Sequence, residues 1–209
     1  SAHNRADRRN VSPAKKKMGN LQLMRLFARA LDNLYNREYD IVGNDVNERC
    51  MAAHVFSYMK NKWNQFKRLR SYQLDYEYNR EGESGLPKKL YCKYVKDKKA
   101  QWHLIIPDLI VHVRGDMSGQ KNLCVIEFKK FGINSSDDIV KLEEMTRQND
   151  DCKFRYKLGL HVVFGMSLDA TEFEVFINGQ SNKKPQMGVG VDEFIGMVVG
   201  CVKGRENAM

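Results

Sequence analysis

Three ionisable side chains interrupt two otherwise apolar stretches of this sequence: Asp108, Glu127 and Lys129. Asp108 lies within the apolar run 105–111, and the other two close the run 123–129. Residues two apart in a β-strand share a face, so Glu127 and Lys129 are expected side by side. A carboxylate and an ammonium group are costly in a core, which indicates a chemical role. If the two strands pair as a hairpin, Asp108 lies beside Glu127.

This trio favours the chemistry of a divalent cation. Two neighbouring carboxylates repel each other, and a bound divalent ion relieves that repulsion. Magnesium prefers oxygen ligands and typically takes one or two protein carboxylates together with substrate phosphate oxygens. Lys129 would then orient or deprotonate an attacking water, or stabilise charge on a scissile phosphate. The alternative is a surface salt bridge of Glu127 with Lys129 or Lys130, with Asp108 as a turn residue.

The pair Pro107-Asp108, followed nineteen positions later by Glu127-Phe128-Lys129, resembles the PD-(D/E)XK nuclease superfamily. The resemblance covers residues 45–177 and implies the restriction-endonuclease-like fold, an α/β architecture with an α-β-β-β-α-β core. It implies that Asp108 and Glu127 hold Mg²⁺, that Mn²⁺ can take its place, and that Lys129 serves catalysis. It also implies that Glu48, in the first core helix, helps to place metal or water, and that DNA is favoured over RNA.

Periodicity and turn residues predict the elements that would position the trio in an α/β domain, a mixed central sheet flanked by helices. Apolar residues at three- and four-residue spacing predict helices, and strict alternation predicts strands. Ser135 opens a sequence that resembles a capping box. The expected order is helices 21–35 and 46–66, strands 74–79, 104–113 and 123–129, a helix 135–148, strands 156–164 and 172–177, and a closing helix 191–199.

Charge and cysteine content narrow the class of partner. The net charge of +9 and the pI of 9.3 favour a polyanion, through counterion release and electrostatic steering. The five cysteines are scattered and form no CxxC pair, which argues against a zinc site and a disulfide framework. No apolar stretch approaches the length of a membrane span and no signal peptide is apparent, so a cytoplasmic protein without a membrane partner is expected.

The chain is expected to hold one domain. Residues 1–17 are polar and basic without periodicity, which predicts a flexible arm. Residues 18–209 then form a single nuclease-like domain, and cutting of paired strands would favour a homodimer.

Other charged residues are candidates for contacts with nucleic acid. Arg80 is a candidate phosphate contact, and Lys89 belongs to a basic, aromatic-rich hairpin in 81–99 that suits backbone and bases. Such lysines also protect sheet edges, which is the alternative for the hairpin. Lys141 is expected either to pair with Asp137 on its helix or to bind phosphate.

Further polar residues have simpler interpretations. Asp75 and Glu77 lie on or beside a strand that is expected to neighbour the site. Glu77 is a candidate for a further metal ligand, with a solvated strand face as an equal alternative. His112 and His161 are interpreted as structural histidines, the first half-buried and the second satisfied within the core.

The leading hypothesis is therefore an Mg²⁺-dependent nuclease. The first rival is a non-catalytic nucleic-acid-binding module on a nuclease-like fold, which would bind without cleaving. The second is a protein-interaction domain whose charge is incidental, in which the acids would lie dispersed.

Overall fold

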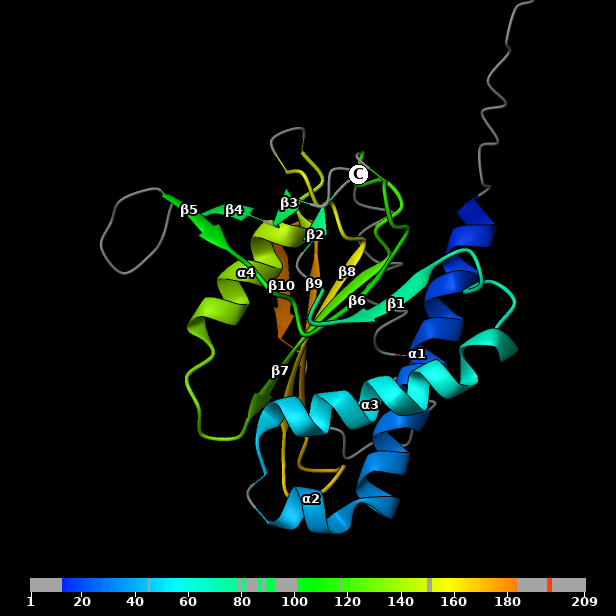
Figure 1. Cartoon of the computed structure of the whole chain (residues 1–209), viewed down its shortest axis with the longest axis vertical. Helices are drawn as coiled ribbons and strands as arrows, with labels where there is room; N and C mark the ends of the chain where they lie inside the picture. The colour runs from blue at the N-terminus through cyan, green and yellow to red at the C-terminus, as the bar shows by residue number, and fades with distance from the viewer. Residues whose placement is uncertain are drawn as a thin grey trace, which may run out of the picture.

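A computed structural model describes residues 13–44, 46–78, 80–81, 86–87, 89–92, 101–116, 118–149, 152–183 and 195–196 (Figure 1). The helices are α1 (Pro13–Arg37), α2 (Tyr39–Gly43), α3 (Glu48–Lys62) and α4 (Ser136–Thr146), with a 3-10 turn at Trp63–Gln65. The strands are β1 (Gln73–Tyr76), β2 (Arg80–Glu81), β3 (Leu86–Pro87), β4 (Lys89–Cys92), β5 (Gln101–Leu104), β6 (Leu109–His112), β7 (Cys124–Lys130), β8 (Leu158–Phe164), β9 (Glu172–Ile177) and β10 (Gln180–Lys183).

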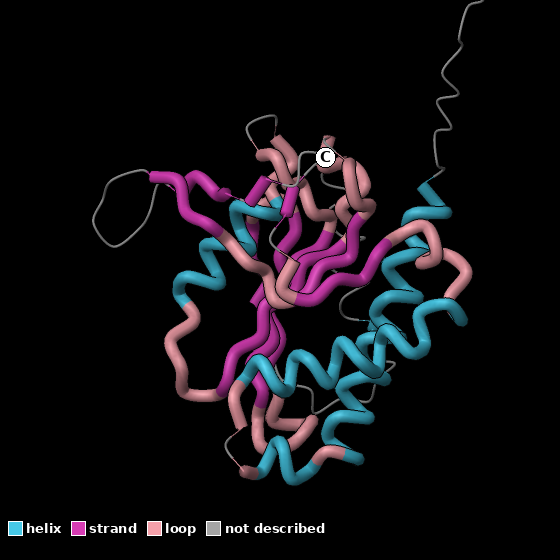
Figure 2. Tube along the Cα trace, viewed as in Figure 1, coloured by secondary structure: helices cyan, strands magenta, loops and turns pink. Residues whose placement is uncertain are grey.

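Six of these strands form one mixed sheet in the order β1-β6-β7-β8-β9-β10. β7 and β8 run parallel, whereas the other neighbouring pairs of this sheet are antiparallel. α4 connects the parallel pair, because parallel strands need a crossover rather than a hairpin. β2 with β3, and β4 with β5, form two small separate sheets. The predicted α/β class, a mixed sheet with flanking helices, is confirmed (Figures 1 and 2).

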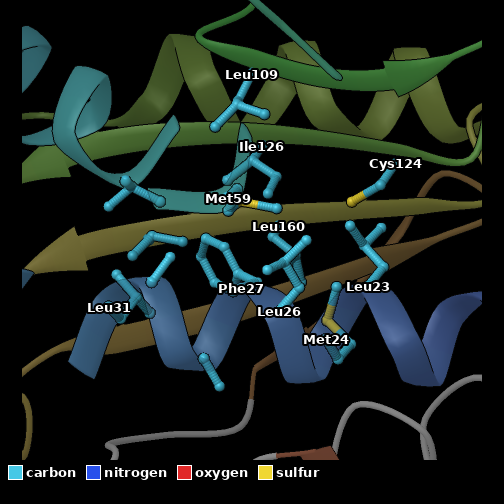
Figure 3. Packing of buried hydrophobic residues seen from close by; sticks show 14 of the residues in the cluster. Leu23, Met24, Leu26, Phe27, Leu31, Met59, Leu109, Cys124, Ile126 and Leu160 are labelled. Carbon is cyan, nitrogen blue, oxygen red and sulfur yellow. The ribbon is translucent and has the colours of Figure 1, made fainter. Parts of the chain in front are cut away.

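Both faces of the sheet are covered, which produces two hydrophobic cores. On one face Ile126 and Phe128 of β7 pack in a core with α1 and α3, and Phe27 of α1 lies next to Phe128. Figure 3 shows Ile126 in this core together with Phe27 of α1 and Met59 of α3. On the other face Val125 belongs to a second core with Leu142 of α4. A strand that is buried on both faces is normally apolar throughout. The charges of β7 at 127 and 129 therefore need partners.

The helices differ from the predicted bounds at their ends. α1 begins at Pro13, so residues 13–17, expected within the flexible arm, are helical, and residues 1–12 lie outside the described residues. α3 ends at Lys62 and gives way to the 3-10 turn, and the short helix α2 was not predicted. No helix within the described ranges is long and apolar enough to cross a membrane.

The expected strand 104–113 is two strands, β5 and β6, separated by four residues that include Pro107. Proline has no N–H to donate to a sheet, which accounts for the break. Asp108 consequently lies immediately before β6 instead of inside a continuous strand.

Two smaller expectations also change. Ser135 is the N-cap residue of α4, but its side chain makes no capping hydrogen bond, so the predicted capping box is wrong. Asn134 instead accepts from the N–H of Ser136 at 2.9 Å. β10 was not predicted. Much of the 81–99 hairpin, and all of the closing helix except 195–196, lie outside the described residues.

Candidate functional site

β6 and β7 bring Asp108 and Glu127 to neighbouring positions. Leu109 pairs with Ile126, so Asp108 and Glu127 come next in the same antiparallel register. Asp108 Oδ2 accepts a hydrogen bond from the N–H of Phe128 at 2.8 Å, which ties the carboxylate to β7. The predicted pairing of these two strands is confirmed, and it places the two acids side by side.

A row of polar residues crosses the sheet on the face that α4 covers. Glu127 of β7 pairs in register with His161 of β8, which pairs in turn with Glu174 of β9. Register neighbours project from the same face of a sheet. We call Asp108, Glu127, His161 and Glu174 the polar row. It extends from the residue before β6 across three further strands.

Glu127 is the most deeply buried acid of the row. Its side chain is 2% exposed, and Oε2 lies 2.9 Å from Nζ of Lys141. Oε1 is buried and has no hydrogen-bond partner among the described residues. Burial raises the pKa of Glu127 to about 8 against the opposing charge of Lys141, and the Asp108 carboxylate adds to the rise.

Lys129 lies on the same face as Glu127, as predicted, and is held by two acids. Its Nζ is 2.9 Å from Asp138 Oδ2 of α4 and 3.5 Å from Glu48 Oε1 at the start of α3. Glu48 Oε2 also accepts from the backbone N–H of Lys130 at 3.3 Å. Burial works to lower the pKa of Lys129, but Asp138 and Glu48 outweigh it and raise the pKa. Glu48 thus contacts the site in two ways, through the ammonium group of Lys129 and through the backbone of β7.

Lys141 reaches the site from the second turn of α4. Its Nζ contacts Asp138 Oδ1 at 3.2 Å as well as Glu127, and its side chain is 19% exposed. The structure pairs Lys141 with Asp138, three residues back, and not with the expected Asp137. Burial works to lower the pKa of Lys141, but Glu127 and Asp138 outweigh it and raise the pKa.

Asp138 is the site residue that the sequence analysis missed. Its two oxygens contact different lysines, Lys129 and Lys141. The signal that could have found it is its spacing of three from Lys141 on the helix that follows β7.

Six charged groups gather at this end of the polar row, and we call them the acid–lysine cluster: Asp108, Glu127, Asp138, Glu48, Lys129 and Lys141. Four carboxylates face two ammonium groups, which leaves two negative charges uncompensated when every group is ionised. Burial raises the pKa of Asp108 to about 6, the Phe128 N–H and Lys141 oppose the rise, and Asp138 and Glu48 add to it.

The two acids with raised pKa fit a divalent cation. Within the described ranges, no group of three or more His, Cys, Asp or Glu residues is arranged to hold a metal ion. Magnesium, however, commonly takes one or two protein carboxylates and completes its shell with water and phosphate. Asp108 and Glu127 supply two carboxylates, and the buried, unpartnered Oε1 of Glu127 is the kind of atom that such an ion satisfies.

The other predicted contacts with nucleic acid stay predictions. Arg80 begins β2 and Lys89 begins β4, in the two small sheets, and the side chains of both lie outside the described part of the chain. His161, expected to be a satisfied core histidine, is buried, but its Nε2 has no partner among the described residues.

A second charged cluster lies farther along the same face, on β1 and β6. Asp75 is buried and receives hydrogen bonds from His112 Nε2 at 2.8 Å and from Arg114 Nε at 2.9 Å. Arg114 Nη2 binds the other carboxylate oxygen, and the guanidinium lies over the ring of Tyr78. His112 is thus a structural histidine, as predicted. Asp75, by contrast, does not lie on a solvated face.

Comparisons of the chain with protein-family models, curated proteins and solved structures found no match. The resemblance to PD-(D/E)XK nucleases accordingly depends on the residues of the acid–lysine cluster and on the order of the elements around them.

Proposed function

We propose that this protein is an Mg²⁺-dependent nuclease of the PD-(D/E)XK type that hydrolyses phosphodiester bonds, with DNA favoured over RNA. The observation that carries the proposal is the register of β6 and β7. It sets Asp108 beside Glu127, on the face that also carries Lys129. Strand alternation puts Glu127 and Lys129 on one face, and the pairing of β6 with β7 adds Asp108 from nineteen positions earlier in the chain.

The acids and the lysine have separate tasks in this proposal. Asp108 and Glu127 would hold the ion, and Mn²⁺ would substitute for Mg²⁺ in the same oxygen-rich place. When bound, the ion would supply positive charge to the phosphate oxygens and make a water molecule more acidic. Lys129, fixed by Asp138 and Glu48, would stabilise the charge that develops on the phosphate.

The charge of the chain supports a polyanionic substrate. The net charge of +9 attracts a phosphodiester backbone over the whole molecule, although the site itself carries excess carboxylates. A cation between those carboxylates and the phosphate removes the local repulsion. The preference for DNA follows from the family resemblance and not from a contact in the structure.

The test is cleavage of plasmid, single-stranded DNA and RNA in Mg²⁺, Mn²⁺ or EDTA. Asp108→Ala and Lys129→Ala should each lower the rate by about 100-fold or more, because each removes charge stabilisation at the reacting phosphate. Asp137→Ala and Lys121→Ala are matched controls that remove the same charges from exposed positions, and they should cleave like the wild type. Cleavage that persists in EDTA, or that survives both site substitutions, would exclude the proposed site.

One observation favours the non-catalytic binding module as a second candidate. Lys129 and Lys141 already compensate part of the acidic charge, so less negative charge is left to attract a cation into the cluster. Binding of DNA without cleavage in every metal tested would favour this candidate.

A further inference from the structure

The two oxygens of the Glu127 carboxylate have different surroundings. Oε2 contacts the ammonium group of Lys141 at 2.9 Å, whereas Oε1 is buried with no partner among the described residues. His161 Nε2, which is also buried and unpartnered, belongs to the register neighbour of Glu127 on the same sheet face. Two such atoms in neighbouring positions indicate a place for a polar ligand beside Oε1 and not beside Oε2.

Lys141 is itself fixed on two sides. Its Nζ lies between Glu127 Oε2 and Asp138 Oδ1, and Asp138 is anchored in turn by Lys129 at 2.9 Å. Because Asp138 and Lys141 lie one turn apart on α4, the helix sets their spacing. The lysine is therefore held where it touches one oxygen of Glu127.

We infer that Lys141 is a positioning residue for the metal ligand Glu127, an inference that rests on the proposed function. Lys141 holds Oε2 and thereby leaves Oε1 as the carboxylate oxygen of Glu127 that is available to the ion. Groups that orient a metal ligand from behind in this way typically contribute 10- to 100-fold to metal affinity. This role differs from the direct phosphate contact that the sequence suggests for Lys141.

The direction in which cation affinity changes when Lys141 is replaced separates this role from a purely electrostatic effect. Removing a positive charge close to a cation site should strengthen cation binding if charge alone matters. Removing a positioning residue should weaken binding, because the buried carboxylate loses its fixed orientation. The two expectations have opposite directions.

The experiment is calorimetric titration of the full chain with Mn²⁺ and with Mg²⁺, in the absence of nucleic acid. Lys141→Met should weaken Mn²⁺ binding at least about 10-fold relative to the wild type. Lys141→Gln, which retains a neutral donor for Oε2, should recover part of the loss. Lys121→Met, a matched loss of charge in the β6–β7 connection, should bind like the wild type. Unchanged or tighter binding by Lys141→Met would overturn the inference, as would a wild type that binds neither ion.

A measurement on the wild type covers the case in which Lys141→Met does not fold. With ¹⁵N-labelled lysine, the ammonium signal of Lys141 should stay protected from exchange when Mg²⁺ is added, because Lys141 keeps its contact with Oε2. A signal that becomes indistinguishable from that of the exposed Lys121 would overturn the inference.

Failure of this inference is distinguishable from failure of the proposed function. A wild type that cleaves DNA while Lys141→Met binds metal normally would refute the role of Lys141 alone. A wild type that binds Mn²⁺ in a Lys141-dependent manner but cleaves no nucleic acid would refute the nuclease alone.

Discussion

Asp75→Asn should destabilise the protein by about 3 kcal/mol at pH 7, because a buried carboxylate would lose its charge-assisted hydrogen bonds from His112 and Arg114. The side chain is 9% exposed and accepts hydrogen bonds from His112 and from two nitrogens of Arg114. Asparagine would replace one acceptor with an NH₂ group that faces these donors. For a domain of this size, such a loss corresponds to a fall in Tm of about 6 to 12 °C.

The pH dependence of this effect has a definite sign. Burial works to raise the pKa of Asp75, but the bonds from His112 and Arg114 outweigh it and hold the pKa well below its ordinary value. A lowered pKa contributes stability that is fully present above the unfolded pKa and is lost as the pH falls through the folded one. The difference between wild type and Asp75→Asn should therefore shrink below about pH 4, where the carboxyl group becomes protonated in the unfolded wild type.

The assay is urea denaturation of both proteins at pH 7, 5 and 3.5. Asp116→Asn is the control. Burial works to raise the pKa of Asp116, but hydrogen bonds from Ser118 and Lys121 outweigh it and lower the pKa, and this residue is only partly buried. Its substitution should cost less than about 1 kcal/mol. The reasoning about Asp75 would be refuted if the two variants lost equal stability at pH 7, or if the Asp75→Asn deficit grew as the pH fell from 5 to 3.5.

Two further predictions concern the first hydrophobic core and its connection to α1. Phe128→Ala should lower the free energy of unfolding by about 3 to 5 kcal/mol in urea denaturation, because its fully buried ring stacks on Phe164. Phe131→Ala, which removes the same ring at a position 68% exposed, should change it by less than about 0.5 kcal/mol, and equal losses would contradict the packing argument. Tyr35→Phe should cost about 1 kcal/mol by thermal denaturation, because its buried hydroxyl contacts Thr171 at 2.6 Å, and an unchanged Tm would show that this bond contributes nothing.

The parts of the site that could be predicted from the sequence depend on local periodicity. Alternation within 123–129 fixes the faces of Glu127 and Lys129, and the structure confirms it. The pairing of the two strands follows from their proximity along the chain. Pro107 could have predicted the break before β6, because proline is poorly tolerated inside a sheet.

The parts that could not be predicted depend on tertiary contacts. Helical spacing allows Lys141 to meet an acid three or four residues back, so it does not distinguish Asp138 from Asp137. Only the position of α4 over β7 decides between them. The burial of Asp75 could not be predicted for the same reason. Alternation identifies the face on which Asp75 lies, but not that Arg114 and His112 cover it. The sequence likewise contains no signal that Glu127 retains an unpartnered oxygen.

Because the polar row depends on the register of β7, the proposed activity would also report whether β7 is correctly paired. A slip of one residue in β7 would send every side chain of that strand to the opposite face. Phe128 would then lie under α4, and Glu127 would enter the core beneath α1, so the site would lose Glu127 and Lys129 together. A collapsed chain with all its helices but a misaligned β7 would be inert toward phosphodiesters. Specific activity would thus be proportional to the fraction of molecules in which β7 is paired correctly.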